Sequence, residues 1–373
     1  FFPSWSYDGS RLVSVSWTDD GLGVIRTVSA GGGSGKAITS DPGHYRRPRF
    51  SPDGRSIVFE KGTGGYITDK DWSEAPGVYT MPAAGGAMAR VTDDGAYPHY
   101  GATNDRIFMT RYDGDAGKLV SVDLRGNEAR EHASGEMVTE FQVSQDGRSV
   151  AFADNYSAFV MPLTPGPQSA GAGRSASALP VTKASGDGAS YMNWSNAALN
   201  WSLGPTLYSA RIADLTPAAP KAEGGDTKAY EPPTQGADLS MTFKADKPTG
   251  AIALVGARIV TMAGEDGGVI ENGVVLIENN RIAAVGPAAA VSYPAGTPTL
   301  DLDGKTIVPG LIDAHAHGPQ ASDDIIPEQN WSAMAHLALG VTTIHDPSND
   351  ASEIFAASEY QRAGEILAPR LYS

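Results

Sequence analysis

Short apolar runs rich in β-forming residues recur through the first 245 residues, and turn residues separate them. In one unit, residues 50–54 (Phe-Ser-Pro-Asp-Gly) form an expected turn that leads into the apolar run 56–59. A further apolar run follows at 78–81, and Gly85-Gly86 separates it from the next run. Short runs bounded by Gly, Pro and Asp are typical of β-strands joined by tight turns. The pattern predicts about four strands in each unit.

This turn recurs along the chain. Clear copies begin at Trp5, Phe50 and Val143, and two weaker copies begin at Tyr100 and Trp194. The copies lie about 40 to 50 residues apart, which is the period of propeller blades. A single Asp-Gly turn occurs in many hairpins, but five copies in register favour a repeat architecture. We therefore predict an all-β propeller over residues 1–245, with about five visible blades.

The turn motif of residues 50–55 and its copies resembles the repeats of TolB-type and dipeptidyl-peptidase-type propellers. The resemblance covers residues 1 to about 245 and implies a domain that binds peptides or proteins. Because most such propellers have more than five blades, we expect further blades upstream of this chain. The sequence contains no Gly-x-Ser-x-Gly nucleophile motif, which argues against a serine peptidase.

The pattern changes after a Pro- and Gly-rich stretch at 213–250, which predicts a linker. Beyond it, β-forming runs indicate a compact antiparallel hairpin system; they lie at 253–262, 273–277, 281–285 and 298–302. From Lys305 onward, strands alternate with helices, which predicts a parallel sheet. The expected strands are 306–316, 341–345 and 369–373, and the expected helices are 329–339 and 352–363. The predicted domains are 1–245, 246–305 and 306–373.

The strongest chemical signal is the run 309–317 (Pro-Gly-Leu-Ile-Asp-Ala-His-Ala-His). On a strand, Asp313, His315 and His317 would share one face, so the two imidazoles would converge. Neutral imidazole is a common ligand of divalent transition-metal ions. In a parallel β/α barrel the active site lies at the carboxyl ends of the strands, where this pair would fall. The alternative is a pair of histidines with a structural role only.

Residues 251–373 resemble the amidohydrolase superfamily, most closely its imidazolonepropionase-like and prolidase-like members. The hairpin system, the run 309–317 and the segment Gly340-Val-Thr-Thr carry this resemblance. It implies a small β-sandwich followed by a (β/α)8 TIM barrel, in which His315 and His317 are ligands of Zn²⁺, as one or two divalent metal ions. A metal-activated water would then hydrolyse an amide C–N bond.

In this family the remaining metal ligands and a proton-shuttling Asp come from later strands, which lie outside this chain. Residues 306–373 are far fewer than the roughly 250 of a full barrel. We therefore expect no catalytic residue within the chain and no activity of the chain alone. The expected partner is the remainder of the same polypeptide, which carries the later barrel strands, and the expected substrate is a small amide or peptide.

Three further residues near the histidines are candidates for substrate contact or for orienting a ligand. His345 and Asp346 end the second expected barrel strand and should reach the barrel mouth. Alternatively, Asp346 and Pro347 only form a turn. Asp313 either orients a histidine or bonds to a neighbouring strand. The other histidines (His44, His99, His132 and His336) are expected to be packed or surface residues.

Composition narrows the choice of partners. The 43 acidic and 28 basic residues give a formal net charge of -15, which disfavours nucleic acid as a partner. No apolar window is long enough to span a membrane as a helix. Cysteine is absent, which excludes thiolate metal sites and disulfides. Family analogy implies a periplasmic or secreted protein, and the sequence leaves a homo-oligomer open. The competing hypothesis is a propeller-based peptide- or protein-binding module of the cell envelope without activity of its own.

Overall fold

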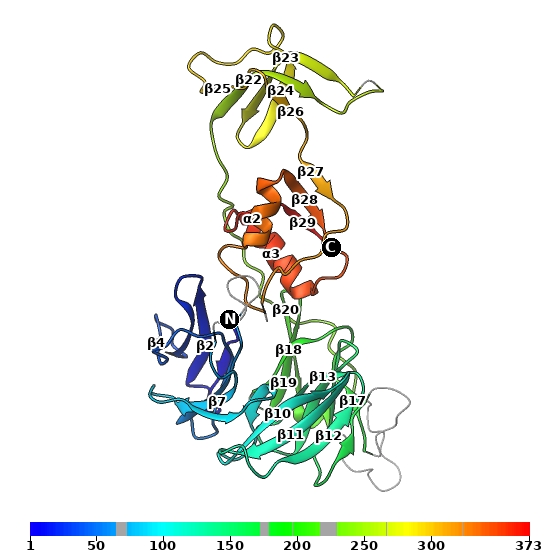
Figure 1. The fold of residues 1–373 in the computed structure, drawn as a ribbon. Coiled ribbons are helices and arrows are strands. Elements are labelled where there is room, and N and C mark those ends of the chain that lie inside the picture. Colours follow the sequence, from blue (N-terminus) through cyan, green and yellow to red (C-terminus); the bar gives the residue numbers. More distant parts are fainter. Residues whose placement is uncertain (65–72, 172–178, 196, 217–229, 266, 323) are drawn as a thin grey trace. The chain divides into compact units, whose positions relative to one another are not determined.

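The computed structural model describes residues 1–64, 73–171, 179–195, 197–216, 230–265, 267–322 and 324–373. These residues fold mostly into β-strands and form two compact units, 1–241 and 242–373 (Figure 1). The three-domain division given above stays a prediction. No helix among the described residues is long and apolar enough to cross a membrane.

The first unit contains five sheets that follow one another along the chain, as the repeats predict. The first two sheets are β1 (Ser4–Trp5), β2 (Arg11–Thr18), β3 (Leu22–Ser29) and β4 (Lys36–Ala37), then β5 (Tyr45–Phe50), β6 (Ser56–Lys61), β7 (Gly77–Pro82) and β8 (Ala89–Thr92). The third is β9 (Ala96–Tyr100), β10 (Arg106–Asp113), β11 (Ala116–Asp123) and β12 (Arg130–Gly135), with β16 (Gln168–Ser169) added parallel to β12.

The fourth sheet is β13 (Val138–Val143), β14 (Ser149–Asp154), β15 (Ser157–Pro162) and β17 (Thr182–Lys183). The fifth is β18 (Ser190–Ser195), β19 (Ala198–Leu203), β20 (Thr206–Arg211) and β21 (Ala237–Asp238), and the short helix α1 (Ile212–Leu215) follows β20. The first strands contact one another in the order β1, β5, β9, β13 and β18, which is the arrangement of propeller blades. The five predicted repeats are therefore confirmed.

The repeated turn has a local physical basis. In the second sheet the Ser51 hydroxyl donates to Asp53 Oδ1 at 2.7 Å and accepts from the backbone N–H of Ser56 at 2.9 Å. Ser6 and Ser144 make the same pair of contacts in the first and fourth sheets. Each serine thus closes the hairpin that joins the first strand to the second.

The second unit begins with a small sheet and continues with a three-stranded parallel one. The small sheet has the order β24 (Arg281–Pro287), β23 (Val269–Glu278), β22 (Ala251–Val260) and β25 (Thr299–Asp301), and β26 (Thr306–Ile307) also pairs with β22. Then follow β27 (Leu311–Asp313), α2 (Trp331–Ala338), β28 (Val341–His345), α3 (Ala351–Ala363) and β29 (Arg370–Tyr372). Strands β27, β28 and β29 are parallel neighbours, so the predicted alternation of strands and helices is confirmed. A closed barrel stays a prediction.

Two expectations about individual segments were wrong. The strand expected at 306–316 is divided: β26 pairs with the small sheet, and β27 begins only after Pro309 and Gly310. Proline has no backbone N–H to donate and so interrupts the ladder. The stretch 213–250 is also more than a linker, because β21 within it forms the fourth strand of the fifth sheet. Its residues 217–229 lie outside the described part.

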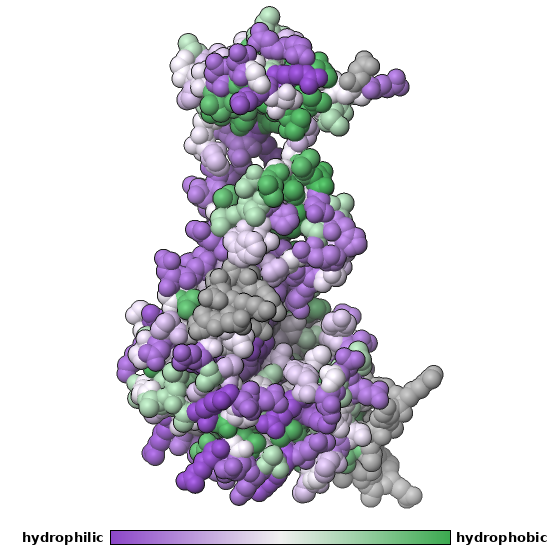
Figure 2. Space-filling model, in the orientation of Figure 1, coloured by the Kyte–Doolittle hydropathy of each residue, from purple (hydrophilic) through white to green (hydrophobic). Residues whose placement is uncertain are grey.

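Large apolar side chains of the second unit are exposed to solvent, and Figure 2 shows hydrophobic residues on its surface. Leu311 and Ile312 of the edge strand β27 are 57% and 70% exposed. Val308, Leu339 and Leu367 are also exposed. On the covered side, Ile344, Ile354 and Leu371 pack β28, β29 and α3 together. The parallel sheet therefore has a buried side toward α3 and uncovered apolar residues elsewhere.

Candidate metal centre

The two predicted metal ligands lie side by side at the carboxyl end of β27. The ring centroids of His315 and His317 are 4.8 Å apart, and the rings meet edge to face. Both residues are exposed. The expectation that they continue a strand was wrong, because β27 ends at Asp313 and a turn follows. The turn nevertheless places the two imidazoles next to each other.

His317 faces a buried carboxylate that comes from the end of the next strand. Its Nδ1 lies 3.5 Å from Asp346 Oδ1 and 3.1 Å from the Ser348 hydroxyl. The side chain of Asp346 is 2% exposed, whereas that of His317 is 54% exposed. Polar contacts at Nδ1 favour Nε2 as the ring nitrogen that a metal ion would use.

Asp346 is itself held by its surroundings. Its Oδ1 accepts from the backbone N–H of Ser348 at 3.1 Å, and its Oδ2 accepts from the Asn349 side-chain amide at 3.1 Å. The Asp346 backbone N–H donates to the carbonyl of Tyr372 in β29 at 2.8 Å. The Asn349 amide also donates to the carbonyl of Gly318, directly after His317. Two strand ends and the histidine turn therefore meet at this carboxylate.

The other two predicted site residues, Asp313 and His345, take part in hydrogen bonds with the backbone of the histidine turn. Asp313 Oδ1 accepts from the backbone N–H of His315 at 3.1 Å, so it orients the turn and not an imidazole ring. His345 is exposed, and its carbonyl accepts from the N–H of Ala316 at 3.0 Å. This backbone bond ties the histidine turn to the end of β28. Among the described residues, no hydrogen bond, ion pair or ring contact joins the His345 side chain to the two other histidines.

The donor set has the chemistry of part of a metal site. Two neighbouring neutral imidazoles, one of them supported by a carboxylate, fit two ligand positions of a divalent ion. Among the residues that the structure describes, no group of three or more His, Asp and Glu could hold a metal ion. Because zinc sites generally use at least three protein ligands, the pair fits a metal only with additional ligands.

Sequence reasoning missed Ser348 and Asn349, which contact His317 and Asp346. The signal was present in the segment Asp346-Pro-Ser-Asn, because an Asp followed by Pro and small polar residues favours a turn closed by its own side chain. The expectation for His336 holds: this residue is half-buried within α2, and its Nδ1 lies 2.8 Å from the carbonyl of Ser332.

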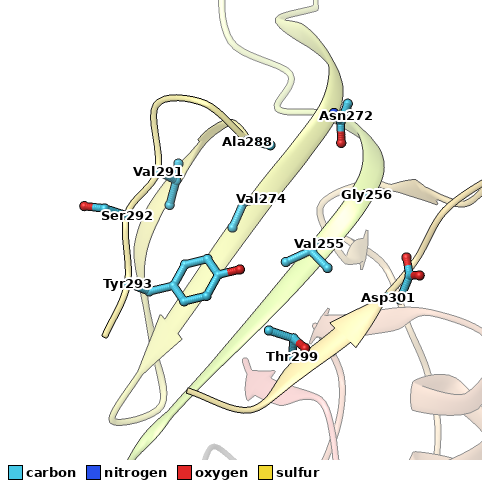
Figure 3. Close-up of a pocket in the computed structure, with 10 residues that line it drawn as sticks. All are labelled: Val255, Gly256, Asn272, Val274, Ala288, Val291, Ser292, Tyr293, Thr299 and Asp301. Carbon is cyan, nitrogen blue, oxygen red and sulfur yellow. The ribbon is translucent and has the colours of Figure 1, made fainter. Parts of the chain in front are cut away.

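A pocket of about 630 Å³ lies in the small sheet of the second unit and includes none of these residues. Val255 and Val274 line it from β22 and β23, and Tyr293 and Asp301 line it from the segments that follow (Figure 3). Tyr293 packs against the cluster that contains Val274. No predicted site residue faces this pocket.

No family model matches the chain. The imidazolonepropionase of Caulobacter vibrioides is 45% identical over 123 residues, which are 31% of this chain and 31% of that protein. The imidazolonepropionase of Sphingopyxis alaskensis is 32% identical over 135 residues, which are 34% of this chain and 33% of that protein. The adenine deaminase of Paracoccus denitrificans is 39% identical over 79 residues, which are 21% of this chain and 13% of that protein.

Two solved structures resemble different parts of the chain. TolB from Acinetobacter baumannii has a TM-score of 0.41 and 18% identity, covering 56% of this chain and 51% of its own. A putative prolidase from Bifidobacterium longum has a TM-score of 0.27 and 30% identity, covering 32% of this chain and 29% of its own. The chain spans about a third of the length of the imidazolonepropionases it matches. Over that part, the chain is homologous to enzymes of the amidohydrolase superfamily.

Proposed function

We propose that the chain is part of a metal-dependent hydrolase of amide C–N bonds, in which His315 and His317 are metal ligands. The observation that carries the proposal is the imidazole pair beside the buried Asp346, at the carboxyl end of a parallel sheet. Homology to imidazolonepropionases and deaminases over this part of the chain supports hydrolysis of a C–N bond.

The chain's own residues have definite roles in this proposal. Asp346 holds the Nδ1 side of His317, so that Nε2 is directed to the ion, and Ser348 assists it. Asp313 fixes the backbone of the turn that carries both histidines. When bound, a divalent ion such as Zn²⁺ supplies Lewis acidity and a water molecule of lowered pKa. The substrate in this proposal is a small amide or peptide.

The proposal includes a partner: the remainder of the same polypeptide, which would supply the later barrel strands and the other ligands. Leu311 and Ile312 on the edge strand β27 support it, since in a closed barrel an edge strand gains a neighbour and its apolar side chains become covered. The short coverage of the relatives is consistent with it. A periplasmic or secreted location is proposed from the TolB-like repeats.

The test begins with intact-mass spectrometry of the purified protein, followed by metal analysis of the same sample. We expect zinc to co-purify with a species that contains the later barrel strands. The variant with both His315→Gln and His317→Gln should lose the metal and the hydrolysis of N-acylated amino acids. The control His336→Gln changes a histidine of α2 and should keep both. Unchanged metal content in the double variant would refute the assignment of the ligands.

The second candidate function is a peptide-binding module formed by the first unit. The contact of its five first strands in series supports this candidate. It is compatible with a hydrolase in the same protein, because the two functions use different residues.

A further inference from the structure

The first strand of each sheet in the first unit contains one extra residue. In the second sheet, Arg46 of β5 pairs with Glu60 of β6, and Arg49 pairs with Val58. Between these two pairs β5 advances by three residues while β6 advances by two. The same irregularity occurs where β9 meets β10, where β13 meets β14 and where β18 meets β19. It also occurs before β1, since Phe1 bonds to Val15 and Ser4 pairs with Val13. Such bulges re-aim side chains and are frequent beside binding sites.

Each repeat has an equivalent residue at its bulge or, for Glu140 of β13, directly beside it. Each lies four positions before the turn residue of its repeat, which is Ser or, in the third repeat, Gly101. We call these residues the bulge set: Phe2, Arg47, Tyr97, Glu140 and Tyr191. Four of them have φ between 45° and 60°, with values of 50° for Phe2, 47° for Arg47, 53° for Tyr97 and 55° for Tyr191. This left-handed conformation costs bulky residues on the order of 1–3 kcal/mol each, and it clusters at functional sites.

Members of the bulge set converge within the first unit. The Arg47 guanidinium lies over the Tyr97 ring at 4.4 Å and over the Phe2 ring at 5.4 Å from the centroid. Burial raises the pKa of Tyr97, and the carboxylate of Glu140 adds to this effect. Because β1, β5, β9, β13 and β18 contact one another in series, the set follows the inner side of the blades. Aromatic and charged groups from different blades thus meet.

Glu60 fixes two of these groups in place. Its Oε2 lies 3.0 Å from Arg46 and 3.2 Å from Arg47, and its Oε1 accepts from the backbone N–H of Tyr97 at 2.7 Å. The side chain of Glu60 is 3% exposed. The bulges of β5 and β9 are therefore bound to one buried carboxylate, which makes this part of the set rigid.

Arg49 lies two residues beyond the bulge, at a position that is polar in every blade. The equivalent residues are Ser4, His99, Gln142 and Asn193. The Nδ1 of His99 contacts the Tyr97 carbonyl, and its Nε2 accepts a hydrogen bond from the Val143 N–H. The side-chain amide of Gln142 donates to the Glu140 carboxylate. None of the hydrogen bonds or ion pairs among the described residues engages the Arg49 guanidinium, and burial lowers its pKa. A partly buried guanidinium without such a partner can pair with an anion.

We propose that the first unit binds the terminal carboxylate of a short peptide, with Arg49 as the partner of the carboxylate and the aromatic members of the bulge set as contacts for an apolar side chain. A carboxylate fits better than a phosphate because Glu60 and Glu140 lie nearby and would repel a second negative charge. Arginine pairs with carboxylates through two parallel hydrogen bonds, and aromatic faces accept apolar groups. The proposal rests on the second candidate function, which it makes specific, and it does not depend on the metal site.

The test is isothermal titration calorimetry of the full chain with N-acetylphenylalanine and with its amide, which has the same shape without the charge. We expect the acid to bind at least about tenfold more tightly than the amide, equivalent to ~1.4 kcal/mol. Arg49→Gln should weaken binding of the acid by a similar factor and leave the amide unchanged. The control Arg148→Gln removes an exposed arginine in the turn of the fourth blade and should bind like the parent.

A second variant guards against misfolding. Tyr191 is 57% exposed, so Tyr191→Ala should keep the melting temperature while weakening both the acid and the amide. Equal binding of acid and amide by the parent would overturn the assignment of Arg49, and so would an unchanged affinity in Arg49→Gln. Inorganic phosphate that binds as tightly as the acid would overturn the peptide class. Failure of the acid to bind at all would overturn the whole proposal.

Discussion

Replacing Glu60 by alanine should lower the free energy of unfolding by about 3–5 kcal/mol, the usual cost of removing one partner from a buried ion pair. Glu60 is almost fully buried and holds Arg46, Arg47 and the N–H of Tyr97. Each hydrogen bond to a charged group contributes about 1.5–3 kcal/mol, and the three share one carboxylate and so do not add fully. The loss would also leave two largely buried guanidinium groups without this carboxylate.

Urea denaturation followed by tryptophan fluorescence measures this loss as a shift of the midpoint at constant slope. Glu60→Gln keeps the size and one acceptor oxygen, so it should be less destabilising than Glu60→Ala. Glu131→Ala, an exposed position on β12, is the control and should change stability by less than about 0.5 kcal/mol. A value for Glu60→Ala as small as that of the control would refute the view that this carboxylate fixes the bulges.

Three further predictions concern other parts of the chain. Asp346→Asn should weaken zinc binding about 10- to 100-fold, because it removes the charge that supports His317; competition with a chromophoric chelator measures it. Gly310→Ala should destabilise the second unit by about 1–3 kcal/mol in thermal unfolding, because the new Cβ would clash with the Thr342 side chain. Burial lowers the pKa of His99 to about 4, so stability present above pH ~6.5 should be lost as the pH falls toward 4.

Each of these three predictions has a variant that serves as its comparison. Asp303→Asn changes an exposed carboxylate of the second unit and should keep zinc affinity. Gly318→Ala meets its nearest atom, the Ser332 hydroxyl oxygen, only at 4.0 Å, so an equal loss in both glycine variants would contradict the steric argument. Below the ordinary pKa of histidine, His99 binds a proton in the unfolded state but not in the folded state, which lowers the stability. His99→Gln removes this proton uptake and should flatten the dependence of stability on pH. An unchanged dependence would show that other groups cause it.

The five blades could be predicted from the sequence because their signal is local. In three of the five repeats a serine, an aspartate and a glycine within five residues make the same turn, as Ser51 and Asp53 do. The helices were predictable for the same reason, since Asn330 and Asp350 cap α2 and α3 by accepting from backbone N–H groups of the first turn. Local chemistry fixed both kinds of element.

The rest depended on pairing between distant segments. Nothing within residues 306–316 indicates that Thr306 and Ile307 pair with β22, some 50 residues earlier in the chain. The histidine pair was predicted as candidate ligands, and Asp346 was predicted as a candidate for substrate contact or for orienting a ligand. That Asp346 contacts His317 depends on contacts between separate strand ends, which the sequence does not give. The extra residue of each first strand was also invisible, because a bulge is defined by the partner strand as much as by its own sequence.

The bulge set separates backbone geometry from side-chain chemistry. Five repeats carry one extra residue in the first strand, and in four of them the residue of the bulge set has a left-handed backbone. The side chains of the set nevertheless differ: Phe2, Arg47, Tyr97, Glu140 and Tyr191. Because the conformation is imposed by the register of each hairpin, a substitution at one of these positions alters the lining without altering the scaffold. Substitutions in single blades could therefore change which ligand this surface binds, while the backbone of the first unit stays the same.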